Sequence, residues 1–185
     1  MADPQAPEEL WATLAGQVNE AMVQRVFQNF TLAMNNRVKR IHLLIQSAGG
    51  IIGDGIAIYN FLKNIPLEVI AYNGGFVQSV AVIAFLGAKK RRASKTATFM
   101  IHRAKLPTPH ATSRELQAVA ETVAIDDARM EGILRAHTRI PADRWEIHNY
   151  TDLHFTAEQA LEYGVIDEIA DFAPQLGAPI FNVIG

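Results

Sequence analysis

Ser79, His102 and Asp152 are residue types that can share the work of a nucleophilic site. A serine hydroxyl becomes a good nucleophile when a neighbouring base removes its proton, and histidine suits that task because it titrates near neutral pH. A carboxylate can hold the imidazole ring in the required tautomer and stabilise its charged form. Composition alone does not choose among the possible acids, which also include Asp54, Asp143 and Asp167.

Each of the three residues also has an ordinary structural explanation. Ser79 stands where an apolar helix is expected to begin, serine is a preferred helix N-cap, and no G-x-S-x-G nucleophile elbow surrounds it. His102 follows a core strand and can be a structural histidine whose nitrogens are satisfied. Asp152 can be a turn aspartate, which is the commoner role for this residue type in a loop.

The Gly49-Gly50 pair follows a buried strand and is a candidate oxyanion site, because glycine allows the backbone to approach a ligand closely. The alternative is a tight strand-to-helix turn. A phosphate-binding loop fits poorly, since the required lysine and hydroxyl residue do not follow, and Gly53 and Gly55 complete no dinucleotide fingerprint. The remaining histidines show no metal-ligand spacing with one another. We therefore expect no metal and no cofactor.

Alternating strands and helices carry these residues, which predicts an α/β fold with parallel strands and right-handed crossovers. The expected strands are residues 10–14, 41–45, 67–72, 97–101 and 165–169, and the expected helices before His102 are residues 18–35, 52–63 and 80–86. A turn at residues 74–75 is expected between the third strand and Ser79. Because parallel strands bring their ends to one edge of the sheet, residues distant in the sequence can meet there.

A long helix is predicted from residue 112 to about residue 137, and Thr112 and Glu115 have the spacing of a capping box. Its apolar residues form a thin stripe among many charges, as in helices that project from a domain and pack on a partner. Two shorter helices are expected after it, one that starts near Pro141 and one that Thr156 caps.

The length of 185 residues fits one domain, which we place at residues 10–185 after a Pro-rich, acidic and mobile tail at residues 1–9. The net charge of −2 gives no reason to expect nucleic acid or an anionic membrane as a partner. No apolar run could span a bilayer, and the first residues lack the basic and apolar regions of a signal peptide. A cytoplasmic location is therefore the default.

Four motifs carry a family resemblance, and their order and spacing agree with it as well as their local sequences. They are IQSAGG at residues 45–50, GIAIY at residues 55–59, FMIH at residues 99–102 and TAEQALEYGVID at residues 156–167. From about residue 16 to residue 169 the sequence resembles the proteolytic subunit of the Clp protease, ClpP, a family of serine peptidases in the ClpP/crotonase superfamily.

The resemblance implies a Ser-His-Asp triad in which Ser79 is the nucleophile, His102 the base and Asp152 the acid. It also implies an oxyanion hole formed by the backbone amides of Gly50 and Val80. In such a site the histidine takes the serine proton while the two amides bind the oxyanion that forms on the attacked carbonyl.

The same resemblance implies a fold of stacked ββα units, with residues 112–137 as a projecting handle helix at the interface between two rings. Heptameric rings, single or stacked, come from the resemblance. Two features of the sequence predict a homo-oligomer independently of the resemblance. They are the apolar stripe of the long helix and the apolar end at residues 178–184, which both need another surface to shield them from water.

The sequence departs from the family pattern at four places. Residues 76–78 are Phe-Val-Gln where Gln-Ala-Ala is usual, and residues 80–81 are Val-Ala where Met-Gly is usual. Residues 103–109 lack the family's flexible glycines. The fifteen residues before Gly16 are too few for the family's axial loop and first helix, which help to dock the ATPase, so an ATPase partner is doubtful.

The leading hypothesis is a serine endopeptidase that cleaves peptides or unfolded polypeptide inside an oligomeric chamber, without tight coupling to an ATPase. The altered setting of Ser79 leaves a second hypothesis, a catalytically inactive scaffold or regulatory subunit. A third hypothesis is a crotonase relative that handles acyl-CoA, which would share the fold but not the triad.

Overall fold

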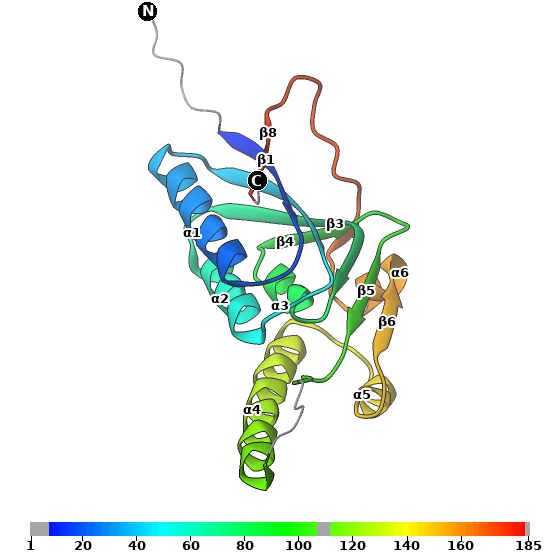
Figure 1. The fold of residues 1–185 in the computed structure, drawn as a ribbon. Coiled ribbons are helices and arrows are strands. Elements are labelled where there is room, and N and C mark those ends of the chain that lie inside the picture. Colours follow the sequence, from blue (N-terminus) through cyan, green and yellow to red (C-terminus); the bar gives the residue numbers. More distant parts are fainter. Residues whose placement is uncertain (1–7, 107–111, 184–185) are drawn as a thin grey trace, which may run out of the picture.

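An eight-stranded sheet forms the centre of the part of the chain that the structure, a computed structural model, describes: residues 8–106 and 112–183 (Figure 1). Its strands are β1 Glu9–Ala15, β2 Arg40–Ser47, β3 Glu68–Gln78, β4 Lys90–Ala93, β5 Thr98–Ile101, β6 Leu153–Thr156, β7 Glu168–Ile169 and β8 Ile180–Asn182. The main path has the order β6-β5-β3-β2-β1-β8, while β4 pairs with both β3 and β7. Each pair is parallel except the antiparallel pair of β5 and β6.

Helices cover one face of this sheet and extend beyond its edge. They are α1 Glu20–Asn35, α2 Ile52–Asn64, α3 Val80–Leu86, α4 Ser113–His137, α5 Ala142–His148 and α6 Ala157–Glu162. α1 and α2 lie side by side, α3 packs against α2 near the centre, and α4 extends away from the sheet (Figure 1). The predicted α/β class with parallel strands is therefore confirmed.

The strands follow the pattern that burial on both faces requires. Along β2, the side chains of Ile41, Leu43 and Ile45 are buried in the main core. The intervening His42 points to the other face, where its ring stacks on Trp11 at 4.0 Å between ring centroids. This second face is thus also covered, which explains the nearly continuous apolar sequence of the strand.

The turn predicted at residues 74–75 is wrong, because β3 continues through both glycines to Gln78. A Cβ atom built on Gly74 would lie 2.9 Å from Cδ1 of Leu44, so a side chain at position 74 would require the end of the Leu44 side chain to shift. The pairing of β2 with β3 changes register there, and the far end of β3 pairs with β5 instead. The longer strand carries Ser79 directly to the end of β5.

Two strands, β4 and β8, could not be predicted from the hydrophobic pattern of the sequence. β4 consists mainly of basic residues, and it pairs with β7 through a register in which Arg92 lies opposite Glu168. These two side chains form an ion pair at 2.8 Å, so charges take the place of apolar contacts. β8 lies in the apolar end that was expected to need a partner, and it is covered in part by pairing with β1.

The predicted tail at residues 1–9 lies outside the described residues except for Glu8 and Glu9. The carbonyl of Glu8 accepts a hydrogen bond from the amide of Lys39 at 2.9 Å, and Glu9 begins β1. Of the segment at residues 103–109, the structure describes residues 103–106, which form neither helix nor strand.

α4 has the predicted capping box, in which Thr112 and Glu115 exchange hydrogen bonds at the helix start. Its C-terminal half packs on α3 through the buried residues Met130 and Leu134. Its N-terminal half projects into solvent, where Leu116 is 47% exposed (Figure 1). Within the described residues, no helix combines the length and apolar character needed to cross a membrane.

Candidate active site

Ser79 occupies a strained position between two regular elements. β3 ends at the preceding residue and α3 begins at the next one, and the backbone of Ser79 has φ 56° and ψ −135°. Such a positive φ is unfavourable for a residue with a side chain and typically costs about 1–3 kcal/mol. The amide of Ser79 donates to the carbonyl of Met100 at 2.7 Å, and seven buried residues of α3 anchor the other side.

The side chain of Ser79 makes no capping hydrogen bond with α3. Helix capping, the ordinary explanation of a serine at this point, therefore does not account for it. The turn is strained, yet its hydroxyl serves no structural purpose among the described residues, and this combination is typical of functional sites.

The Gly49-Gly50 pair lies directly beside Ser79. A Cβ atom on Gly49 would come within 2.6 Å of Cβ and 3.0 Å of Oγ of Ser79, so only glycine fits. Val18 bridges this loop, donating its amide to the carbonyl of Gly49 at 2.9 Å and accepting from the amide of Ile51 at 2.9 Å. The bridge leaves the amide of Gly50 without a hydrogen bond within the described chain.

Val80 supplies the second amide predicted for an oxyanion hole. It is the first residue of α3, and amides in the first turn of a helix have no acceptor within the helix. Two backbone amides without intrachain partners therefore lie close to Ser79, one on the residue after it and one in the adjacent glycine loop. Such amides can stabilise an oxyanion.

Ser79 and His102 line the same cleft of about 670 Å³, whose wall also includes Gly50 and Phe76. His102 is the first residue after β5, so the strand pairing of β3 with β5 brings these two residues to one edge of the sheet. No hydrogen bond joins the two side chains in the described structure. They are neighbours in a cavity in a resting arrangement.

The Nδ1 atom of His102 lies 2.5 Å from the carbonyl oxygen of Arg103. A carbonyl can only accept, so Nδ1 carries the proton, and in the neutral ring Nε2 is then free to accept. A general base needs this tautomer. In this structure the carbonyl of Arg103 accepts the Nδ1 hydrogen bond that the predicted acid would accept.

Asp152 is not paired with His102. Its Oδ1 lies 3.3 Å from Nζ of Lys105, and both side chains are partly exposed. The backbone nevertheless brings the acid close, because β5 and β6 pair antiparallel with Ile101 opposite Leu153. Continuing this register by one residue places His102 opposite Asp152. Side-chain rotations, and not a misplaced strand, separate the predicted base from the predicted acid.

A second, much smaller cavity lies on the other side of Ser79 and His102, between α3, α4 and α5. Its remaining volume is about 10 Å³, and its lining includes Arg103, Asp127, Glu131 and His148. Sequence reasoning missed these four residues. The only signal was the four-residue spacing of the two acids on one predicted helix, which does not reveal which face they occupy.

His148 is buried in this region, and its Nδ1 has no hydrogen-bond partner in the described structure. Burial lowers the pKa of His148 below its ordinary value, and the positive charge of Arg103 lowers the pKa further. The imidazole of His148 is therefore neutral near pH 7.

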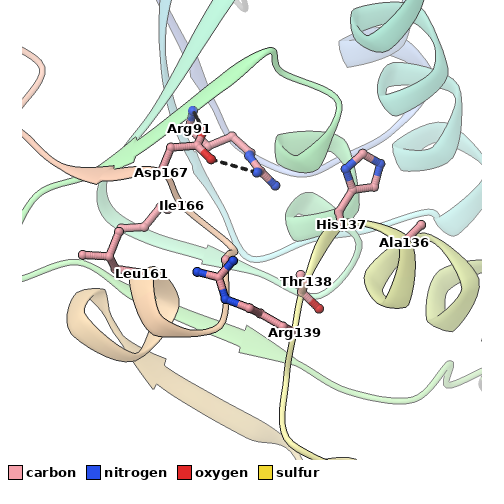
Figure 2. A pocket seen from close by; sticks show the side chains of 9 residues that line it. Arg91, Ala136, His137, Thr138, Arg139, Leu161, Ile166 and Asp167 are labelled. Carbon is pink, nitrogen blue, oxygen red and sulfur yellow. Dashed lines mark hydrogen bonds and ion pairs between the residues drawn. The ribbon is translucent and has the colours of Figure 1, made fainter.

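The competing acid Asp167 belongs to another pocket, of about 450 Å³, beside the end of α4 (Figure 2). Figure 2 shows Asp167 joined to Arg91, whose Nη2 lies 3.0 Å from Oδ1 of Asp167, while His137 at the end of α4 and Arg139 in the segment after it line the same pocket. This pairing removes Asp167 as a partner of His102. Among the described residues, no group of three or more His, Cys, Asp or Glu side chains could hold a metal ion.

The fold and this edge of the sheet define a class of protein, an α/β protein with a serine and a histidine beside a glycine loop. Comparison with known proteins gives the family. The family model described as Clp protease matches residues 7–172, so the chain belongs to the Clp protease family.

Curated relatives agree with this assignment. The chain is 30% identical over 173 residues to "ATP-dependent Clp protease proteolytic subunit 3" of Rhodococcus jostii, covering 90% of this chain and 85% of that protein. It is 31% identical over 159 residues to "ATP-dependent Clp protease proteolytic subunit" of Dehalococcoides mccartyi, covering 84% and 79%. A solved structure of a ClpP1 mutant from Listeria monocytogenes shares the fold with a TM-score of 0.75 and 21% sequence identity. The match covers 91% of this chain and 94% of that chain.

Proposed function

We propose that this chain is a serine endopeptidase of the Clp protease family, in which Ser79 is the nucleophile, His102 the general base and Asp152 the acid. The observation that carries the proposal is the strained Ser79 turn, which borders one cleft with His102 and the glycine loop. No ordinary structural role explains this arrangement, and all its parts are those that acyl transfer needs.

In the proposed reaction, Nε2 of His102 takes the proton of Ser79 as the oxygen attacks the carbonyl carbon of a peptide bond. The amides of Gly50 and Val80 bind the oxyanion, and the loss of one such donor typically costs about 10²–10³ in rate. His102 then gives its proton to the leaving amine. Water repeats the sequence on the acyl enzyme and releases the second product.

Asp152 would join the site by leaving Lys105 and turning toward Nδ1 of His102, in place of the Arg103 carbonyl. The proposal therefore includes a resting and an aligned arrangement of the same backbone. The exposed ion pair of Lys105 and Asp152 is weak, since such pairs are worth about 0–1 kcal/mol. Little energy is therefore needed to separate Asp152 from Lys105.

The substrates that we propose are peptides and already unfolded polypeptide, cleaved inside a homo-oligomeric chamber in the cytoplasm. The relatives carry "ATP-dependent" in their names. No step at the Ser79 site uses a phosphate, and hydrolysis of a peptide bond is downhill, so cleavage of short peptides requires no nucleotide. Tight coupling to an ATPase is not part of the proposal.

A peptide assay tests the proposal directly. The wild-type oligomer is expected to hydrolyse internally quenched peptides without ATP, and Ser79→Ala is expected to reduce kcat/KM by about 10⁴-fold or more. Ser113→Ala, which truncates an exposed serine on α4, is the matched control and should retain activity. Equal activity of Ser79→Ala and the wild type would overturn the proposal.

A second candidate function is a catalytically inactive scaffold or regulatory subunit. The observation that favours it is the pairing of Asp152 with Lys105 instead of His102. A folded wild-type oligomer that hydrolyses no peptide under any condition that retains its assembly would support this candidate. No observation favours the third hypothesis, a crotonase relative that handles acyl-CoA, and the assignment to the Clp protease family argues against it.

A further inference from the structure

The small cavity beside Ser79 has the position of a substrate side-chain pocket. Ser79 and His102 border two cavities, and the larger one contains Gly50, where the carbonyl oxygen of a bound acyl group would lie. The side chain next to that carbonyl needs space on another side of the serine oxygen. The small cavity between α3 and α4 is the space that the described structure offers there.

The composition of this cavity is unusual for a pocket that receives an apolar side chain. Its walls are apolar and come from Ile83, Ile101, Met130 and Leu134. Beside them stand two carboxylates, Asp127 and Glu131, whose side chains are only 17% and 30% exposed. Acidic side chains this deep in a protein are normally paired with a cation.

Arg103 supplies that cation in the present structure. Its Nη1 lies 3.4 Å from Oε2 of Glu131 and 3.6 Å from Oδ2 of Asp127, and its Nη2 donates to Oδ1 of Asn149 at 2.5 Å. With Arg103 in place, the cavity retains about 10 Å³, which is room for about one water molecule. The guanidinium therefore fills the pocket and neutralises it.

Arg103 belongs to residues 102–106, which form neither a helix nor a strand. Its side chain is 36% exposed and can rotate outward without breaking the β5 pairing. The segment itself keeps an anchor on α4, because the amide of Ala104 donates to Oδ1 of Asp127 at 2.6 Å. When the Arg103 side chain rotates outward, Oδ2 of Asp127 and Oε2 of Glu131 lose their ion-pair partner.

The charges around the vacated pocket favour another cation. The remaining groups that face the two acids are Arg135, whose Nε lies 2.8 Å from Oε1 of Glu131, and His148. Arg135 also stacks over the ring of Trp145 at 4.4 Å, which holds it at the rim. Without Arg103, Arg135 would be the one permanently charged side chain bonded to these two carboxylates among the described residues, and a partly buried carboxylate without a cation is unfavourable.

We propose that this pocket binds the substrate side chain on the acyl side of the cleaved bond and selects a basic residue, arginine above lysine, while Arg103 occupies the pocket in the absence of substrate. Arginine is favoured because its planar fork can reach both carboxylates, whereas an ammonium is a compact point charge. The inference rests on the proposed peptidase function and adds a substrate class to it.

The test uses three quenched peptides that differ only at the residue before the cleaved bond, which is arginine, lysine or norleucine. The wild-type oligomer should show kcat/KM for arginine at least about 10-fold above norleucine, with lysine between them. The Asp127→Asn/Glu131→Gln double variant should bring the arginine-to-norleucine ratio to about one. Asp126→Asn, on the same helix but paired with Arg129 at 2.9 Å, is the matched control and should retain the ratio.

A second variant keeps the proposal testable if the double variant does not fold. Arg103→Ala removes the internal competitor and should lower KM for the arginine peptide several-fold, with little change for norleucine. Hydrolysis that favours norleucine in both the wild type and Arg103→Ala would overturn the basic pocket and leave the peptidase proposal standing. No hydrolysis of any peptide, together with no modification of Ser79 by a fluorophosphonate, would overturn both.

Discussion

Ser79 depends on its neighbours to maintain a backbone conformation that it would not adopt alone. The carbonyl of Met100 accepts a hydrogen bond from the amide of Ser79. The absence of a side chain on Gly49 leaves room for the Cβ atom of Ser79. His102 already has the tautomer that a base needs, although a backbone carbonyl provides it. At the scale of residues, the proposed triad still lacks two contacts, the hydrogen bond between Ser79 and His102 and the turn of Asp152 from Lys105 toward Nδ1 of His102.

Removal of the Lys105 side-chain charge should favour that rotation. Lys105→Met is expected to raise peptide hydrolysis by up to about 5-fold, because the exposed ion pair that it breaks is worth no more than about 1 kcal/mol. Steady-state kinetics with one peptide measures the change. Lys95→Met, an exposed lysine away from this ion pair, is the control. A fall in activity for Lys105→Met alone would show that Lys105 supports the site instead of restraining it.

At the scale of elements, the link between β2 and α2 positions the glycine loop of the candidate site. Val18 ties the glycine loop to the chain before α1 through two backbone hydrogen bonds, so the free amide of Gly50 is part of a rigid turn. The long β3 and the short α3 then bring Ser79 against this turn. The elements that hold the site are regular and well buried, as precise positioning requires.

Gly49→Ala should damage this link. The new Cβ would lie 2.6 Å from Cβ of Ser79 at a backbone φ of 99°, so we expect a loss of about 1–3 kcal/mol in unfolding free energy and a large loss of peptidase activity. Gly53→Ala is the control, because its Cβ meets no atom within 4 Å inside α2. That change should stabilise the protein by about 0.5–1 kcal/mol. Urea unfolding compares the two, and equal stabilities would contradict the close packing.

Much of the fold could be predicted from the sequence, because regular hydrophobic periods and helix caps are local signals. The capping box at Thr112 and the end of α3 at Gly87 are examples. The exceptions depend on tertiary contacts between segments that are distant in the sequence. β3 continues through Gly74 because it pairs with β2 before the glycines and with β5 after them, and β4 forms from basic residues beside β7, where Glu168 pairs with Arg92.

The candidate site could be predicted only in part for a similar reason. Motifs in the sequence indicated Ser79, His102 and Asp152, and the strand pairing brings the backbone of all three to one edge. The partners of these side chains depend on rotamers and on a segment that follows no pattern. Nothing in the sequence indicated that Arg103 would turn toward α4 or that Lys105 would take Asp152.

At the scale of the whole molecule, α4 packs on the described residues mainly through its C-terminal half. The residues of its apolar stripe follow a helical period: Leu116, Val119, Val123, Met130 and Leu134. The C-terminal end of the stripe is buried in this chain, whereas Leu116 is exposed. This exposed continuation of a buried stripe is the surface that a second copy of the chain would cover in the proposed homo-oligomer.

Leu116→Glu should therefore weaken assembly, because it places a charge in the proposed contact between copies. We expect sedimentation velocity to show a shift from a large oligomer toward a smaller species at the same protein concentration. Gln117→Glu introduces the same charge at an exposed position beside the stripe and should leave assembly unchanged. A wild-type protein that is monomeric at micromolar concentration would contradict the oligomer itself.

Stability should fall as the pH is lowered from 7 to 5.5. Burial lowers the pKa of His42, His137 and His148, so in this range the unfolded chain binds protons that the folded chain does not. The free energy of unfolding then decreases with falling pH, by at most about 1.4 kcal/mol per pH unit for each histidine. Urea unfolding at the two pH values measures the change. An equal or higher stability at pH 5.5 would contradict it.

The most direct measurement of the central claim is the intact mass of the protein after treatment with a fluorophosphonate, which modifies only an activated serine. We predict one adduct on each wild-type chain and none on Ser79→Ala, because one serine has both a base and two free amides beside it. No adduct on a folded wild-type oligomer, or an adduct that persists on Ser79→Ala, would contradict the assignment of Ser79 as the nucleophile.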